Sequence, residues 1–331
     1  MKATIVYALI STPEDFYLEE NLISLYSLRI HDKRSRVVVL TDEPTSCHIK
    51  SHCVNIMDYI DELRIIDVPN DYNNTERSRF LKTNLAKLVE GDFLYIDGDT
   101  VIADNLDDIE SYDGDICQVA DGNGMLFIEE ESRTVSIFKM LNWESCVGRP
   151  FFNSGFMYVH NNERTQTLYG QWYSRWLESR QVKNFQDQPP YVKACMDTDM
   201  KITHLPDIWN CQIRAQGFYC IGEAKVIHPF AGLSDSLFLI YKRPVMEEIR
   251  NNGFVKKELI EMITHPRIAF EKDILVLRHQ EKAFMDSFLH AVFMNQPKLY
   301  GRINSFLGWV YKLTHKEGKF TPAKININRW K

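Results

Sequence analysis

The segment Leu94-Tyr95-Ile96-Asp97-Gly98-Asp99-Thr100 places two carboxylates two residues apart, directly after an apolar run. Side chains at positions i and i+2 of a strand project to the same side, so Asp97 and Asp99 can face one ion. Gly98 has no side chain, which lets a ligand approach the backbone between the two acids. Because carboxylate oxygens prefer hard divalent cations, the segment predicts a site for Mn²⁺ or Mg²⁺. The alternative is a surface turn in which Asp and Gly are only good turn formers.

The first hundred residues around this segment alternate between predicted strands and helices. Continuous apolar runs rich in β-branched residues predict strands that are covered on both faces, and apolar residues at helical spacing predict helices that pack on a sheet. In chain order these are strand 4–10, helix 17–31, strand 37–40, strand 63–68, helix 76–89 and strand 93–96. The order predicts an α/β fold with a central, mostly parallel sheet, in which ligands gather at the carboxyl ends of the strands.

The rhythm changes after residue 110, where shorter elements are expected to complete the sheet and form a second wall of the cleft. The predicted elements are strands 116–120, 156–160, 202–205 and 225–227 and helices 164–180 and 188–195. After Pro244 the pattern is helical to the end of the chain. We therefore predict a catalytic domain over residues 1–244 and a helical C-terminal extension over 245–331, which contacts the acceptor or a membrane.

The composition indicates an ordinary globular protein, with 44% hydrophobic and 25% charged residues and a formal net charge of −6. This mild negative charge does not favour nucleic acid as a partner. Seven scattered cysteines without a C-x-x-C pair indicate reduced thiols in a cytoplasmic protein rather than a disulfide framework or a zinc site. The sequence shows no apolar run of the roughly 18–20 residues that a membrane span needs, so we expect a cytoplasmic or, at most, peripheral protein.

Other motifs accompany the Asp-x-Asp segment in a fixed order. They are Arg77-Ser78-Arg79-Phe80-Leu81-Lys82, Phe151-Phe152-Asn153-Ser154-Gly155-Phe156, Asp187-Gln188, Leu205-Pro206-Asp207-Ile208-Trp209-Asn210 and Val226-Ile227-His228-Pro229-Phe230-Ala231-Gly232. Together they resemble glycosyltransferase family 8, the retaining galactosyl- and glucosyltransferases of the GT-A fold, which include enzymes of bacterial lipopolysaccharide type. The resemblance spans about residues 3–235, and its weight comes from the order of the motifs, because each motif alone is weak.

The resemblance implies a metal-dependent retaining glycosyltransferase of polysaccharide biosynthesis, which moves a hexose from a nucleotide-sugar, expected to be a UDP-sugar, to a glycan or lipid-linked glycan. It implies three metal ligands, namely Asp97, Asp99 and His228. It places Asp187 and Gln188 beside the reacting sugar carbon. The donor-binding residues that it implies are Ala8, Ile10, Arg79, Asp97, Asn153, Ser154, Gly155 and Gly232.

The sequence departs from the family pattern at both ends of the donor site. The first predicted strand ends in Ala8-Leu9-Ile10-Ser11, without the acidic and amide groups that the family offers to the base. Ser234-Asp235 stand where the family has a phosphate-binding lysine. Since no carboxylate is forced into the position of a nucleophile, we favour departure and attack on one face of the sugar over a covalent intermediate.

Several of these residues have a purely structural alternative. His228, after an apolar strand, could be a hydrogen-bonded core residue, and Asp187 before Pro189-Pro190 could be a helix N-cap. Arg79 and Lys82, three residues apart, could form a solvated helix stripe.

The other candidate site residues also have purely structural interpretations. Asn153, Ser154 and Gly155 could be a turn before a strand. Trp172 and Trp176 are expected in the core rather than as sugar-stacking platforms.

Two other functional classes fit part of the pattern. Asp97-Gly98-Asp99-Thr100-Val101 also fits the loop of haloacid-dehalogenase-type phosphohydrolases, in which the first Asp is phosphorylated. That loop normally follows the first strand of its domain, whereas three predicted strands precede it here. The second alternative is a sugar-binding module that keeps the fold without catalysis.

The C-terminal segment 297–331 is basic and aromatic, with eight Lys or Arg residues against one acid, Glu317. Aromatic side chains suit a membrane–water boundary, and basic ones suit an anionic leaflet. The segment therefore predicts either peripheral contact with the inner face of a membrane or a helix that packs on the domain.

Overall fold

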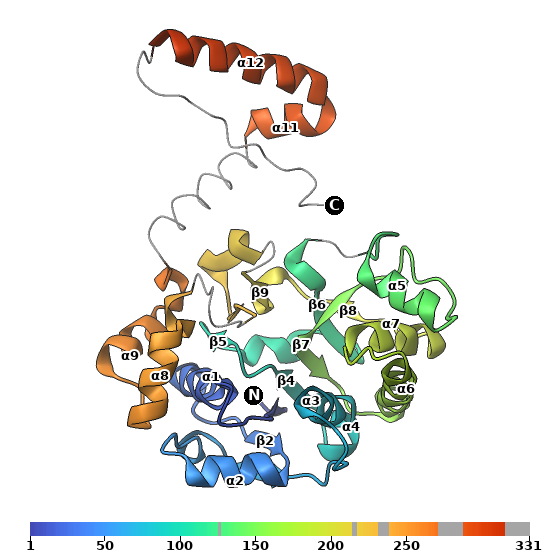
Figure 1. The fold of residues 1–331 in the computed structure, drawn as a ribbon, viewed down its shortest axis with the longest axis vertical. Helices are drawn as coiled ribbons and strands as arrows, with labels where there is room; N and C mark the ends of the chain where they lie inside the picture. Colours follow the sequence, from blue (N-terminus) through green and yellow to red (C-terminus); the bar gives the residue numbers. More distant parts are fainter. Residues whose placement is uncertain (125–126, 214–216, 231–237, 271–286, 315–331) are drawn as a thin grey trace. The chain divides into compact units, whose positions relative to one another are not determined.

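The computed structural model describes residues 1–124, 127–213, 217–230, 238–270 and 287–314. The chain forms two compact units, Met1–Glu271 and Lys272–Lys331 (Figure 1). The helices of the first unit are α1 (Tyr17–His31), α2 (Glu43–Ser51), α3 (Asn74–Thr83), α4 (Leu85–Leu88), α5 (Arg133–Met140), α6 (Glu163–Gln181), α7 (Gln188–Asp197), α8 (Arg243–Asn252) and α9 (Lys257–Thr264). Because α8 and α9 both contact α1, they belong to this unit by packing, while the functional boundary at residue 244 stays a prediction.

A seven-stranded sheet forms the centre of the first unit, in the order β3-β2-β1-β4-β7-β6-β8. Strands β1 to β4 are parallel to one another, and β7 runs antiparallel to both β4 and β6. The predicted α/β fold with a mixed, mostly parallel sheet is confirmed. The strands are β1 (Thr4–Ala8), β2 (Val37–Thr41), β3 (Glu62–Ile65), β4 (Phe93–Ile96), β6 (Ile116–Ala120), β7 (Phe152–Val159) and β8 (Thr203–His204).

Both faces of the sheet are covered, as the continuous apolar strands predicted. Alternate strand residues such as Phe93 and Tyr95 share one core cluster with Trp172 of α6 and Tyr191 of α7. The helices α6 and α7 contact each other on the right of Figure 1, and α1 contacts α8 and α9 on its left. Because both faces of these strands are buried, the positions of the strand ends are fixed. The residues that directly follow the strands are held in place with them.

A separate sheet of three strands, β5-β10-β9, begins where the chain continues beyond β4. Its strands are β5 (Val101–Ile102), β9 (Cys211–Gln212) and β10 (Val226–His228), with β10 antiparallel to β5 and parallel to β9. The chain leaves the main sheet at Ile96 and enters the small sheet at Val101. The Asp-x-Asp segment is thus the junction between the two sheets, a position that the sequence did not predict.

Local side chains explain where the predicted elements differ from the observed ones. The predicted helix 76–89 is interrupted at Asn84, whose side-chain amide donates to the Phe80 carbonyl oxygen at 2.8 Å. The helix α2 was not predicted, because its apolar pattern is weak. Its start nevertheless carries two local signals, an Asp42 N-cap that accepts from the Thr45 amide and Pro44 in the first turn.

The second unit contains two described helices, α11 (Phe288–Asn295) and α12 (Pro297–Thr314), which contact each other. The rings of Phe293 and Tyr300 meet edge to face, with centroids 5.1 Å apart. This confirms the helical pattern predicted for that part of the chain. Among the described residues, we find no helix with the length and apolarity to span a bilayer.

Candidate active site

Three side chains converge at the junction of the two sheets. Asp97 and Asp99 follow β4, and His228 is the last residue of β10. One ligand atom of each, two carboxylate oxygens and an imidazole nitrogen, lies within 4.8 Å of the other two. This donor set of two hard oxygens and one nitrogen suits Mn²⁺ and, less well, Mg²⁺. The residues predicted as metal ligands are therefore brought together.

A chain of amides fixes the orientation of His228. The Asn210 side chain donates through Nδ2 to Asn153 Oδ1 at 2.9 Å, so its oxygen faces His228 Nδ1 at 3.0 Å. His228 Nδ1 then carries the proton, and Nε2, which lies 3.1 Å from Asp99 Oδ1, is the ring atom left to bind an ion. His228 is buried and hydrogen-bonded, as its core alternative requires, yet its second nitrogen is presented to the acidic pair.

The charge around His228 favours a cation at this position. Burial alone would lower the pKa of the imidazole, but Asp99, through its charge and its hydrogen bond, and Asp97 raise that pKa above its ordinary value. Two nearby carboxylates that stabilise a proton on the ring would also stabilise a metal ion in place of the proton.

Gly155 leaves room for the three side chains. Its carbonyl oxygen accepts from the Asp97 amide at 2.8 Å, which brings β7 against the metal ligands. A Cβ on Gly155 would lie 2.6 Å from both Asp97 Oδ2 and His228 Cε1. The predicted alternative, a turn at residues 153–155, is wrong, because these residues lie inside β7.

We therefore expect Gly155→Ala to weaken Mn²⁺ binding by about 10- to 100-fold, the scale found for changes around metal ligands. The methyl group would displace Asp97 or His228, since neither contact can be accommodated at 2.6 Å. Titration with Mn²⁺, followed by electron paramagnetic resonance, measures the affinity. Gly170→Ala on α6 is the control, because beyond the local helix backbone no atom lies within 4 Å of its added Cβ. An unchanged affinity in Gly155→Ala would contradict this account of the site.

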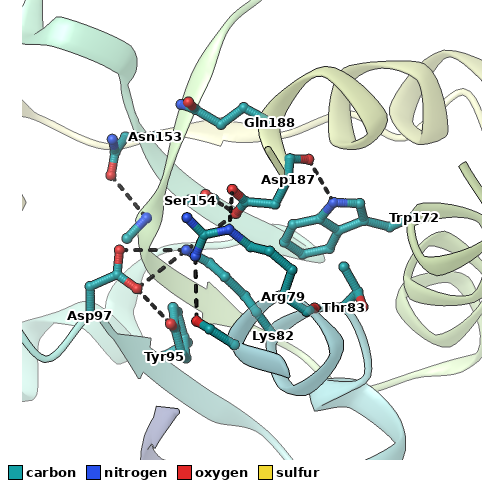
Figure 2. Close-up of polar contacts among 12 residues, drawn as sticks. Arg79, Lys82, Thr83, Tyr95, Asp97, Asn153, Ser154, Trp172, Asp187 and Gln188 are labelled. Atoms are coloured by element: carbon teal, nitrogen blue, oxygen red, sulfur yellow. Dashed lines mark hydrogen bonds and ion pairs between the residues drawn. The ribbon is translucent and has the colours of Figure 1, made fainter. Parts of the chain in front are cut away.

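A second cluster, of opposite charges, lies beside the acidic pair. Figure 2 shows Arg79 and Lys82 of α3 directed toward Asp187, with Lys82 also reaching Asp97. Lys82 Nζ lies 3.2 Å from Asp97 Oδ1 and 3.4 Å from Asp187 Oδ2, and Arg79 Nε lies 3.1 Å from Asp187 Oδ1. Lys82 is only 2% exposed, so the alternative of a solvated stripe is wrong.

Asp187 precedes α7 but does not cap it. Its side chain accepts no hydrogen bond from the helix and instead accepts from the Ser154 hydroxyl at 2.8 Å. Burial would raise the pKa of this carboxyl, but Arg79, Lys82 and Ser154 outweigh burial and hold the pKa below its usual range. The N-cap alternative is wrong, and Asp187 is an ionised carboxylate held by two cations.

The backbone at Asp187 is anchored by the core. Trp172 Nε1 donates to the Asp187 carbonyl oxygen at 2.9 Å (Figure 2). Trp172 and Trp176 are both fully buried, as predicted. The core helix α6 therefore positions a polar residue of the cavity.

Asp121 is a positioning residue that the sequence analysis missed. Its Oδ1 accepts from Gln188 Nε2 at 2.8 Å and from Asn153 Nδ2 at 3.0 Å. It thereby ties together two predicted site residues that are 35 positions apart. Asp121 directly follows β6, so the rule that found Asp97, a polar residue after a buried strand, would also have found Asp121.

The three candidate metal ligands and the Arg79–Lys82–Asp187 cluster line one cavity of about 620 Å³. The predicted donor-binding residues Ala8 and Ile10 line it together with Arg79, Asn153 and Gln188. The remaining predicted donor-binding residue, Gly232, lies outside the described residues. The cavity carries two basic groups from α3 and more acidic groups, among them the Asp-x-Asp pair and Asp187. An anionic ligand would therefore need a bound cation to offset the acidic groups.

Residues 10–231 of the chain match the sequence model of glycosyl transferase family 8. The chain resembles the solved structure of galactosyltransferase LgtC in complex with donor and acceptor sugar analogues, at 15% identity and a TM-score of 0.51 over 78% of this chain and 99% of that one. An active-site mutant of LgtC gives 15% identity and a TM-score of 0.52 over 77% and 98% of the two chains.

The bifunctional glycosyltransferase WbbM gives 14% identity and a TM-score of 0.50 over 80% of this chain and 51% of its own. At such identities these likenesses show the fold alone. A comparison with curated proteins gives no significant match.

Proposed function

The chain belongs to glycosyl transferase family 8 and is a glycosyltransferase of the GT-A fold, and on that premise we propose that it uses a nucleotide-sugar, in particular a UDP-hexose, as its donor and a glycan or lipid-linked glycan as its acceptor. The observation that carries this proposal is the convergence, in one cavity, of Asp97, Asp99 and His228 with the Arg79–Lys82–Asp187 cluster. The phosphohydrolase alternative is set aside by the family membership.

We infer that Asp97, Asp99 and His228 hold a divalent cation, Mn²⁺ in preference to Mg²⁺ because one ligand is an imidazole. When bound, such an ion offsets the charge that develops on a leaving diphosphate. Lys82 supports the same task from the protein side. It is a buried cation that faces Asp97 and Asp187, and it can turn toward a phosphate oxygen that arrives between them.

The engagement of Asp187 favours transfer on one face of the sugar. Its Oδ1 faces Arg79, and its Oδ2 faces Ser154 and Lys82, so both oxygens are already engaged by the protein. Such a carboxylate is a weak nucleophile but can stabilise positive charge on the sugar ring. In the proposed reaction the bond from the sugar carbon to the diphosphate oxygen breaks, the bond to the acceptor oxygen forms, and the acceptor proton passes to the diphosphate.

Hydrolysis of nucleotide-sugars tests the proposed function, since water can replace a missing acceptor. Purified protein with Mn²⁺ should hydrolyse one donor of a panel of UDP-, GDP-, ADP- and CDP-hexoses slowly, and a UDP-hexose is the expected one. Binding of the donor without any turnover would favour the non-catalytic sugar-binding module. Turnover of phosphomonoesters, together with an adduct of beryllium fluoride on Asp97, would instead favour the phosphohydrolase alternative.

The helix α12 supports an acceptor at a membrane surface. Phe306, Leu307, Trp309 and Leu313 are all at least half exposed on it, and Lys298 and Arg302 lie on the same helix. Side chains of these two kinds together suit the boundary of an anionic bilayer. The second half of the predicted basic segment, 315–331, lies outside the described residues.

We expect the full-length protein to sediment with anionic vesicles at low salt and to be released at high salt. Phe306→Ser with Trp309→Ser should reduce binding severalfold, because both aromatic anchors are lost. Phe254→Ser is the matched control, since Phe254 is as exposed as Trp309, at 58%, but belongs to the first unit. If the double variant binds vesicles as well as the control does, α12 is not a membrane contact.

A further inference from the structure

Glu20 is a buried carboxyl group without a partner. It lies on α1, is 1% exposed and contributes to the wall of the cavity that holds Asp99. Neither of its carboxyl oxygens has a hydrogen-bond partner among the described residues. Glu19, the adjacent residue, is equally buried but pairs with Arg250 at 2.6 Å. Arg250 of α8 therefore provides a counter-charge for one of the two neighbouring acids, and the other lines the cavity.

An unpaired buried carboxyl group destabilises the folded chain. Burial raises the pKa of Glu20 well above its usual range, and the charges of Asp99, Asp15 and Glu19 raise it further. The side-chain amide of Asn21 also has no partner among the described residues, and it lies where a Cβ on Gly98 would come within 2.9 Å. Buried polar groups are normally satisfied, so an unsatisfied carboxyl group at the wall of a binding cavity points to a ligand.

The charges around Glu20 restrict what that ligand can be. Asp15 and Asp99 are its neighbours, so a phosphate would be repelled. A metal ion would need further ligands, and the only cluster of three candidate ligand groups among the described residues is Asp97, Asp99 and His228, which excludes Glu20. A neutral group that donates a hydrogen bond, a hydroxyl or an N–H, fits, because a carboxyl group accepts hydrogen bonds in either protonation state.

The other walls of the cavity indicate which part of a donor carries this group. Arg79, Asn153 and Gln188 lie on the side of Asp187 (Figure 2), where the sugar is expected. Glu20 instead has Asp15 as a charged neighbour, and Asp15 accepts hydrogen bonds from Ser11 and Thr12 just beyond the end of β1, where Ala8 and Ile10 also line the cavity. We propose that Glu20 determines specificity by accepting a hydrogen bond from the nucleoside of the donor, either a ribose hydroxyl or a base N–H. This rests on the proposed function and supplies the polar group that the end of β1 lacks.

Calorimetric titration with nucleoside diphosphates and Mn²⁺ tests the inference. The tightest binder of UDP, GDP, ADP and CDP is compared with its 2′-deoxy, 3′-deoxy and N-methylated-base analogues. The wild type should bind one analogue about 10- to 100-fold more weakly than the parent, the effect of leaving a buried hydrogen-bonding group unsatisfied. Glu20→Met should bind the parent that much more weakly and should no longer distinguish it from that analogue. A loss of affinity with a deoxy analogue identifies a ribose hydroxyl as the donor of the hydrogen bond, and a loss with the N-methylated analogue identifies the base N–H.

The melting temperature distinguishes a ligand-binding role of Glu20 from a structural role, because the two roles predict opposite changes in melting temperature on substitution. Without ligand, Glu20→Gln and Glu20→Met should melt at least as high as the wild type, because each removes an unpaired buried carboxyl group. Glu19→Gln is the matched control and should melt lower, since it leaves Arg250 without a full partner.

The outcomes separate this inference from the proposed function. If no nucleoside diphosphate binds the wild type, the proposed function is wrong and the role of Glu20 falls with it. If one binds and Glu20→Met still discriminates against the analogue, only the role of Glu20 is wrong. A melting temperature of Glu20→Gln as low as that of Glu19→Gln would mark a structural carboxylate and would also overturn the role.

Discussion

Asp97→Asn and Asp99→Asn are each expected to reduce turnover of the donor by about a thousandfold, which corresponds to roughly 4 kcal/mol of transition-state stabilisation. Each change removes one negative charge from the site while it keeps the shape of the side chain. Affinity for Mn²⁺ should fall with turnover. The melting temperature should stay near that of the wild type, because both side chains are partly exposed, at 27% and 24%, and because Lys82 keeps Asp187 as a buried counter-charge when Asp97 is replaced.

The matched control for these variants is Asp92→Asn. Asp92 directly precedes β4, so it lies at the opposite end of the strand that carries Asp97, where it pairs with His160 at 2.9 Å. This control should keep its turnover and its Mn²⁺ affinity. Chelation with EDTA should inactivate the wild type, and added Mn²⁺ should restore it. Full turnover in EDTA would show that the acidic pair has a purely structural task.

The predictions that succeeded depend on local sequence patterns. The helix Tyr17–His31 and the strands Phe93–Ile96 and Ile116–Ala120 have the predicted bounds, because each is a sharply bounded apolar pattern. The position of Asp97 after β4 follows from the same kind of signal.

What could not be predicted depends on contacts between distant segments. Lys82 and Asp187 are more than 100 residues apart, and nothing near either residue shows that they pair. Each residue therefore had a purely structural interpretation from its local sequence, a solvated helix stripe for Lys82 and an N-cap for Asp187. The structure excludes both, since it brings α3 and the start of α7 together over one cavity.

The same limit explains why Glu19 and Glu20 are indistinguishable in the sequence. The two acids are adjacent on one helix, and both would be expected at its solvated surface. The fold buries both of them, and only the position of Arg250, more than 200 residues later, gives a partner to one and not to the other. Whether such an acid has a partner among the described residues therefore depends on the fold, and the neighbouring sequence does not show it.

Asp187→Asn should have the second largest effect, a loss of turnover of about 10²- to 10³-fold, because it removes the negative charge expected to stabilise the sugar in the transition state. Unlike the changes at Asp97 and Asp99, it should also destabilise the fold, by about 3 kcal/mol, since Arg79 and Lys82 would lose a buried counter-charge. Ser154→Ala is the control. It removes one hydrogen bond to the same carboxylate and should cost only about 1 kcal/mol.

The pH dependence of stability identifies the charge of Asp187 as the cause. The pKa of its carboxyl is lowered in the folded protein, so the stabilisation is fully present above the ordinary pKa of about 4 and is lost as the pH falls toward the folded value. The difference in unfolding free energy between wild type and Asp187→Asn should therefore be constant from pH 7 to about 5 and should shrink below about pH 4. Denaturant titrations at these pH values measure it. If the difference persists undiminished at pH 3, the destabilisation comes from packing, and Asp187 is not the ionised partner of Arg79 and Lys82.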